Sequence, residues 1–219
     1  MLILIGKSGS GKTAVVNELV KRGSWKKAVT YTTRPIRPGE VNGVDYNFVS
    51  QEEFDRLKAN DFFAETTAYD ASFGHCEYGS AVKDYQEYGD NIVMILNPHG
   101  LNAVRKYMKA HPHSGMEIHP VYLKASEDVL LKRLDKRGDS KEEVLRRLKT
   151  DRTDFMMLST EYFIPVDKLS VEEVADEIEK HFETGKFKPE EDYCPCSTYG
   201  DYGPSNPWDA PGMSIHDFI

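Results

Sequence analysis

The sequence begins with an apolar pentapeptide that is followed at once by a glycine-rich stretch, Gly6-Lys-Ser-Gly-Ser-Gly11-Lys12-Thr13. The stretch fits G-x-x-x-x-G-K-[ST] and leads into helical apolar periodicity over 11–22. When a strand, a glycine-rich turn and a helix follow in this order, backbone N–H groups of the turn and the N-terminus of the helix point toward the same place. Such a place suits a phosphate group. A plain flexible turn would need all these features to coincide by chance. We therefore expect triphosphate binding at Gly6, Ser8, Gly9, Ser10, Gly11, Lys12 and Thr13.

Within this loop, Lys12 and Thr13 are expected to carry the chemistry. The lysine ammonium reaches the β and γ oxygens of a bound triphosphate, and the hydroxyl that follows it is a ligand for Mg²⁺. Mg²⁺ is therefore the expected cofactor, with Thr13 as its protein ligand. The motif by itself does not distinguish kinases from GTPases, ATPases and motor proteins.

Further along the chain, short apolar runs alternate with segments of helical periodicity. The expected strands are 2–5, 28–32, 91–96, 117–123 and 162–164, and the expected helices are 11–22, 51–58, 100–110, a helical stretch through 158 and a closing helix that begins with a capping box at Ser170-Val-Glu-Glu173. Alternation of this kind predicts crossover connections and a parallel sheet covered on both faces, which is an α/β fold.

Charge and composition exclude several other classes of protein. The net charge of −8 gives no general attraction for nucleic acid, and no apolar run approaches the roughly 20 residues that span a membrane. The three cysteines cannot form a disulfide framework, so a cytoplasmic location is expected. Neither the cysteines nor the histidines have partners at metal-ligand spacing, so no metal site is expected there. From 185 to 219 the chain is rich in proline and acidic residues and loses its periodicity, which predicts a mobile or loosely docked tail after a globular part at 1–184.

The stretch that separates the possible functions is Thr30-Tyr-Thr-Thr-Arg34-Pro-Ile-Arg37-Pro-Gly39-Glu-Val-Asn-Gly43-Val-Asp-Tyr46-Asn-Phe48. Its prolines and glycine prevent a regular helix and hold two arginines three positions apart. Arginine binds phosphate through two parallel hydrogen bonds, so the pair indicates a second phosphate site, although two arginines alone are more often a solvated turn. With the neighbouring residues included, the chain resembles the guanylate kinases over about residues 1–183.

The resemblance implies a P-loop kinase with a parallel sheet core, an inserted monophosphate-binding lobe at about 33–80 and a helical lid at about 126–150. It implies ATP as the phosphoryl donor and GMP or dGMP as the acceptor. It assigns the acceptor phosphate to Arg34, Arg37, Tyr46 and Tyr78, and the base to Thr30, Glu65 and Ser80. A carboxylate such as Glu65 can accept from both N1–H and the 2-amino group of guanine, a pair of donors that adenine lacks. Taken alone, Glu65 would be an ordinary surface carboxylate.

The sequence departs from the family at two places near the base. Asn97, in Asn97-Pro-His-Gly100, stands where the family has an aspartate that contacts the base. Its amide oxygen can still accept from an amino group, but without the assistance of charge, so the guanine preference is expected to be weaker. The segment between Glu65 and Tyr78 is also longer than in the family, which places an insertion within 68–77.

A basic helical stretch follows the fourth expected strand. One helix begins near Ser126 and is closed by Gly138, and a capping box at Ser140-Lys-Glu-Glu143 opens the next. A solvated charged face is the usual explanation of such a run. The match to the guanylate kinase lid makes Arg133, Arg137 and Arg147, rather than Arg146, the expected catalytic partners of Lys12, because lid arginines bring positive charge to the transferring phosphoryl group.

The sequence therefore predicts ATP-dependent phosphorylation of GMP or dGMP, and two alternatives stay open. One is a P-loop kinase of another nucleoside monophosphate or of a phosphorylated sugar. The other is a non-catalytic binding module with the same fold. The intact Lys12-Thr13 pair argues against the binding module, and Glu65 and Ser80 argue against the sugar kinase, because a sugar needs no base pocket.

Overall fold

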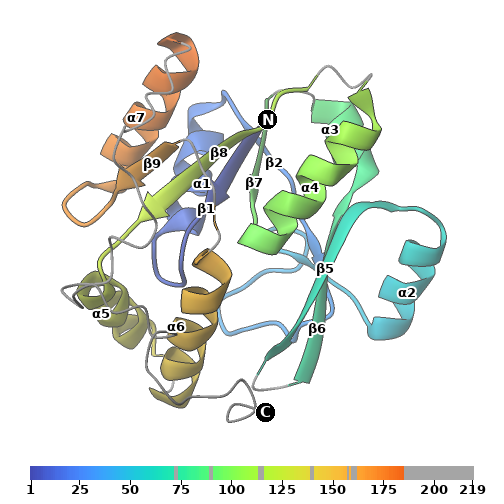
Figure 1. Ribbon diagram of the computed structural model, residues 1–219, viewed down its shortest axis with the longest axis horizontal. Coiled ribbons are helices and arrows are strands. Elements are labelled where there is room, and N and C mark those ends of the chain that lie inside the picture. The colour runs from blue at the N-terminus through green and yellow to red at the C-terminus, as the bar shows by residue number, and fades with distance from the viewer. Residues whose placement is uncertain are drawn as a thin grey trace, which may run out of the picture.

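A five-stranded parallel sheet with β1 (Leu2–Ile5) at its centre forms the core of the protein (Figure 1). The computed structural model describes residues 1–71, 74–88, 91–112, 116–138, 141–156, 158 and 162–184. The strand order is β2 (Lys26–Lys27), β7 (Ile92–Ile95), β1, β8 (His119–Lys124) and β9 (Tyr162–Pro165), and all neighbours are parallel. The predicted α/β fold is confirmed.

Successive residues of β1 point to opposite faces of the sheet and divide the core into two clusters. Leu2 and Leu4 pack with α1 (Lys12–Arg22) and α7 (Val171–Thr184). Ile3 and Ile5 belong to the cluster that includes residues of α3 (Val82–Tyr88), α4 (Pro98–Ala110) and the last residue of α6 (Lys141–Phe155). Because both faces are covered, all four β1 residues are apolar and buried, as is typical of a central parallel strand.

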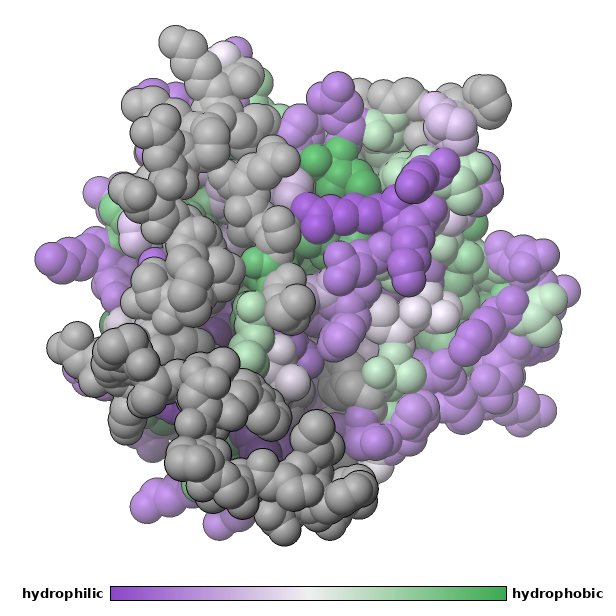
Figure 2. Space-filling model, in the orientation of Figure 1, coloured by the Kyte–Doolittle hydropathy of each residue, from purple (hydrophilic) through white to green (hydrophobic). Residues whose placement is uncertain are grey.

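A second sheet of four strands holds a different part of the chain, between β2 and α3. Its order is β4 (Asn47–Phe48), β3 (Tyr31–Thr32), β6 (Gly74–Ala81) and β5 (Phe63–Ala71). α2 (Gln51–Ala59) packs against it through Phe54, whose ring stacks on that of Phe63 with centroids 4.6 Å apart. The other side of α2 is exposed, and hydrophilic residues predominate at the right edge of Figure 2, where α2 lies in Figure 1.

The chain crosses from one sheet to the other inside a segment that was expected to be a single strand. The prediction of one strand over 28–32 is wrong, because β2 ends on the parallel sheet and β3 begins on the four-stranded sheet. The N–H of Ala28 donates to Val93, while the carbonyl of Thr30 accepts from Asn47. An apolar pattern cannot distinguish one strand from two short ones that change partners.

The hairpin of β5 and β6 and the short helix α3 were not predicted. Thr67 pairs with Tyr78 and Ala71 pairs with Gly74, so the described residues of the expected insertion within 68–77 lie in the outer part of this hairpin. The sequence of this hairpin is polar and alternates only weakly between polar and apolar residues, so it does not indicate strands. β-propensity also depends strongly on the neighbouring strand, which the sequence does not identify. The predicted capping box at residue 170 is confirmed, because Glu173 N–H donates to Ser170 Oγ and Ser170 N–H donates to Glu173 Oε2.

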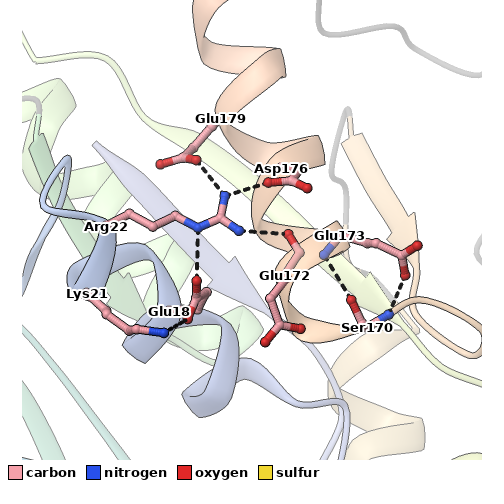
Figure 3. A network of polar contacts seen from close by, with 8 residues as sticks. All are labelled: Glu18, Lys21, Arg22, Ser170, Glu172, Glu173, Asp176 and Glu179. Atoms are coloured by element: carbon pink, nitrogen blue, oxygen red, sulfur yellow. Dashed lines mark hydrogen bonds and ion pairs between the residues drawn. The ribbon is translucent and has the colours of Figure 1, made fainter.

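Arg22, at the end of α1, joins the first helix of the chain to the last (Figure 3). Its guanidinium donates to Glu18 on its own helix and to Asp176 and Glu179 on α7, at 2.7–3.1 Å. It also donates to the carbonyl of Glu172. Four acceptors around one arginine form a network, which stabilises more than an isolated surface ion pair does. The network fixes α7 against the helix that follows the phosphate loop.

Among the described helices, including α5 (Glu127–Arg137), none combines the length and apolar character needed to cross a membrane. The expected tail at 185–219, with Cys194 and Cys196, and the capping residue Ser140 lie outside the described residues.

Candidate active site

A cavity of about 620 Å³ lies at the carboxyl ends of β1 and β7, between the phosphate loop, the four-stranded sheet and helices α5 and α6. It brings together residues that are far apart in the sequence. Of the predicted site residues, the cavity is lined by Gly6, Ser8, Gly9, Gly11, Lys12, Thr13, Thr30, Arg34, Arg37, Tyr46, Glu65, Tyr78, Asn97, Arg133, Arg137 and Arg147. Ser10 and Ser80 do not line it, since both are buried behind the wall.

The phosphate loop needs glycine for two different reasons. A side chain at Gly6 would approach the carbonyl oxygen of Leu123 to 3.0 Å and would lie still closer to the hydroxyl of Ser10. Gly11, which caps α1, has a φ of 95°, a conformation that L side chains rarely adopt. The loop can therefore fold tightly onto the end of β1 and present its N–H groups to the cavity.

Lys12 is enclosed by the loop that precedes it. Its ammonium donates to the carbonyls of Gly6 at 2.6 Å and Lys7 at 3.0 Å. Burial lowers the pKa of Lys12 to about 8, and the positive charges of Arg137 and Arg147 act in the same direction. The carboxylate of Asp151 opposes this shift. The cavity thus gathers positive charge around one point, an arrangement that suits a polyanion.

The two arginines of the acceptor loop have different surroundings. Arg34 is almost fully buried and binds Glu40 through both terminal nitrogens at 2.8 Å, while its guanidinium lies 4.9 Å from the centre of the Tyr46 ring. Arg37 donates to the Glu40 carboxylate only through its backbone N–H. No hydrogen bond to its guanidinium is seen among the described residues, and burial together with Arg147 and Arg34 lowers its pKa. Arg37 is therefore the less satisfied cation of the pair.

Glu65 is a buried carboxylate with one oxygen left unpaired. It is 7% exposed on β5, and its Oε1 accepts from the hydroxyl of Ser80 on the paired strand β6 at 2.6 Å. Its Oε2 is buried and has no hydrogen-bond partner. Burial raises the pKa of Glu65 to about 7, although the Ser80 hydroxyl and backbone N–H act against the shift. An unpaired buried acceptor is costly in a folded protein, so the site is built for a ligand that donates hydrogen bonds.

We expect Glu65→Gln to stabilise the ligand-free protein at pH 8. The pKa of Glu65 is about 7 in the folded state against an ordinary value of 4.5, so between these pH values the folded state keeps a proton that the unfolded state has released. Stability due to this group is therefore lost as the pH rises from 4.5 to 7, by about 3 kcal/mol. Urea unfolding at pH 5 and pH 8 measures the effect, with Glu52→Gln on exposed α2 as the control. An equal pH dependence in wild type and Glu65→Gln would contradict the burial of this charge.

Asn97 caps helix α4. Its Oδ1 accepts from the N–H of Gly100 at 2.7 Å, and Pro98 occupies the first position of α4. The helix expected from 100 therefore begins at Pro98, because the asparagine cap and the proline favour a start there. Asn97 also lines the cavity, so the residue that caps α4 is at the same time part of the candidate site.

The arginines of α5 and α6 are held in place by specific partners. Arg133 donates to the carbonyls of Gly9 and Val166, which ties α5 to the phosphate loop. Arg147 is 9% exposed and donates to Glu143 at 2.6 Å. Positioned cations of this kind stabilise charge without the cost of reorganising during the reaction.

Four acidic residues that line the cavity were not singled out from the sequence: Glu40, Asp45, Asp151 and Asp154. Asp151 accepts from the backbone N–H of Ser8 at 2.7 Å, and Asp154 lies 3.3 Å from the ring of His99. Their positions on α6, three residues apart, indicated one helical face, but nothing in the sequence showed which face meets the loop. No group of three or more His, Cys, Asp and Glu side chains able to hold a metal ion occurs in the described part of the chain.

Comparison with known proteins gives one consistent result. The profile of the guanylate kinase family matches residues 1–185. A guanylate kinase from Streptomyces kasugaensis is 35% identical over 185 residues, which cover 81% of this chain and 84% of the relative, and one from Thermobifida fusca is 36% identical with coverage of 81% and 88%. Among solved structures, a guanylate kinase from Anaplasma phagocytophilum has the same fold, with a TM-score of 0.61, 23% identity and 86% of each chain covered.

Proposed function

Because the chain belongs to the guanylate kinase family, we propose that it transfers the γ-phosphoryl group of ATP to GMP or dGMP, which yields ADP and GDP or dGDP. The observation that carries the choice of guanine is Glu65, which lines the same cavity as the phosphate loop and has a buried Oε2 without a hydrogen-bond partner. Guanine offers two adjacent donors, N1–H and the 2-amino group, to such a carboxylate, whereas adenine offers an acceptor at N1.

The residues of the cavity divide the chemistry between them. Lys12 and the N–H groups of the loop bind the β and γ phosphates, and Thr13 supplies an oxygen ligand of the kind that Mg²⁺ prefers. When bound, Mg²⁺ neutralises phosphate charge. Arg137 and Arg147 add positive charge where the phosphoryl group passes to the acceptor. No covalent intermediate is required, because positioning and charge stabilisation account for catalysis, and an acceptor phosphate ionised near neutral pH needs no general base.

The division of the chain into functional parts forms part of this proposal. Glu65 and Tyr78 lie on the four-stranded sheet, and Arg34 lies in the loop that follows β3. All three line the cavity, so the lobe at about 33–80 binds the acceptor. Helices α5 and α6 carry the arginines of the lid at about 126–150, and β1 with α1 carries the donor site. The cavity between them is where donor and acceptor meet.

A coupled ADP-release assay with GMP, dGMP, AMP, CMP and UMP tests the proposed function. We expect turnover with GMP or dGMP to exceed that with the other three. Turnover only with AMP or a pyrimidine nucleotide would keep the monophosphate kinase and reject the guanine assignment. Nucleotide binding without turnover of any acceptor would favour the non-catalytic module.

Replacing Arg37 by alanine should weaken GMP binding by about 1.5–3 kcal/mol, the range for a hydrogen bond to a charged group. ADP binding should change little, because Arg37 belongs to the acceptor loop. Arg34→Ala should weaken GMP binding as well and also destabilise the loop, since it removes the guanidinium that binds both carboxylate oxygens of Glu40. Calorimetric titration measures both affinities, and Arg56→Ala on α2 is the control for removal of a positive charge. Loss of ADP binding with GMP binding retained would reverse the assignment of the two sites.

A chain ended at residue 185 should keep its fold and most of its activity. The sequence beyond this point shows no core pattern, and α7, the last described helix, already packs on α1. Thermal melting and the coupled assay on the shortened chain measure this. Loss of cooperative melting would place Trp208 or the final residues in the core.

A further inference from the structure

A carboxylate of the protein itself occupies a donor of the phosphate loop. The backbone N–H of Ser8 belongs to the loop that turns its donors toward the cavity, and it donates to Oδ2 of Asp151 at 2.7 Å. Asp151 lies on α6, far from the loop in sequence, so the contact is made by the tertiary fold. A hydrogen bond from an N–H group to a carboxylate is about twice as strong as one to a neutral acceptor.

The charges around Asp151 are those that a bound phosphate would meet. Lys12 interacts electrostatically with Asp151, and the same lysine is influenced by Arg137 and Arg147. The other carboxylates that line the cavity have partners elsewhere: Glu40 binds Arg34, Asp45 accepts from Val41 N–H, Glu65 accepts from Ser80 and Asp154 lies beside His99. Among these acids of the described chain, Asp151 is the one bound to a backbone donor of the phosphate loop.

We propose that Asp151 is a built-in competitor of the nucleotide: in the free protein its carboxylate holds a donor of the phosphate loop, and a bound nucleotide must displace it. This inference rests on the proposed function in one respect, namely that the loop binds a nucleotide phosphate. Asp151 would then lower the affinity of the phosphate loop for nucleotide, although it lies on α6, outside the sequence motif of the loop.

Displacement follows from geometry and charge. The Ser8 N–H cannot make a full hydrogen bond to a phosphate oxygen and to Asp151 together. Two negative groups a few ångströms apart also repel each other, and the burial of Asp151 reduces the screening of this repulsion by water. Asp151 therefore opposes nucleotide binding, and its release frees the surface of α6 that faces the loop.

Asp154 provides a matched control for this inference. It lies on the same helix, carries the same charge and lines the same cavity, but it contacts His99 at the start of α4 instead of the loop. A variant at Asp154 therefore changes the net charge of the cavity and one contact of α6, while the Ser8 donor stays occupied by Asp151.

Calorimetric titration of the full chain with pyrophosphate, and with ADP in the presence and absence of Mg²⁺, tests the proposal. Asp151→Ala should bind both ligands about tenfold more tightly than the wild type, the scale of one charge-assisted hydrogen bond. Asp151→Asn keeps an acceptor without the charge and should fall between the two. Asp154→Asn should stay within about twofold of the wild type. Thermal melting of each variant shows that it is folded, and the isosteric asparagine carries the test if the alanine variant is not.

Each other outcome would overturn the proposal. Unchanged or weaker binding by the Asp151 variants would show that the carboxylate does not compete. Weakening confined to the Mg²⁺ titrations would assign Asp151 to the metal instead. Equal tightening in Asp154→Asn would reduce the effect to general charge. If the wild type bound neither ligand, the proposed function would fail as well, whereas a wild type that phosphorylates GMP without any effect at Asp151 would refute this inference alone.

Discussion

Replacing Lys12 by alanine should reduce turnover by about a hundredfold or more while the protein stays folded. The ammonium sits inside the loop, where it donates to the carbonyls of Gly6 and Lys7. Of the two lysines in the loop, Lys12 lines the cavity and Lys7 does not. The loss should appear mainly in kcat, because the charge stabilises the phosphoryl group most while that group is in transit.

The measurement is the coupled assay with saturating ATP and GMP, together with thermal melting. Lys21→Ala, at the exposed end of the same helix, removes an equal charge outside the cavity and should keep wild-type turnover. Removal of the enclosed ammonium should not lower the melting temperature, since its burial is itself unfavourable. Unchanged turnover of Lys12→Ala would reject a phosphoryl transfer that depends on this loop.

The second large effect is expected at the base. Sites that hydrogen-bond a substrate group can reject analogues without it by about 10⁴–10⁵, and Glu65 with its unpaired Oε2 is such a site. Glu65→Gln presents an amide donor to the donors of guanine, so the ratio of kcat/KM for GMP to that for AMP should fall steeply. The loss should come from the GMP side, because AMP gains no contact in the wild type.

Asn97→Asp changes the same preference in the opposite direction. A carboxylate at this position adds charge to the acceptor side of the base pocket and, as a helix cap, can still accept from the N–H of Gly100. The GMP to AMP ratio should therefore rise while stability stays close to that of the wild type. Ratios unchanged in both variants would show that neither residue faces the base, and the monophosphate kinase would then need another source of selectivity.

The sequence predicts the donor side better than the acceptor side, for a physical reason. The phosphate loop is local: its strand, glycines, lysine and helix lie within 22 residues, so spacing alone places them. The pairing of Glu65 with Ser80 depends on the register of a hairpin, and the split between β2 and β3 depends on which sheet each segment joins. Asp151 is beyond prediction from spacing, because its role follows from how α6 packs on a loop 143 positions away. The roles proposed for Arg34, Glu65 and Arg147 come from resemblance to a family, because periodicity does not indicate them.

The central place of β1 has a consequence for how the protein acquires its fold. Its neighbours in the sheet are paired through Val93 and His119, and the helix that follows it is tied to Asp176 and Glu179 near the end of the described chain. Contacts of such high sequence separation make folding slow, since long loops must close before the contacts repay the lost entropy. During synthesis the phosphate loop emerges before β7, β8 and α7, the elements on which β1 and α1 pack. The site that binds nucleotide therefore matures only when almost the whole domain has been synthesised.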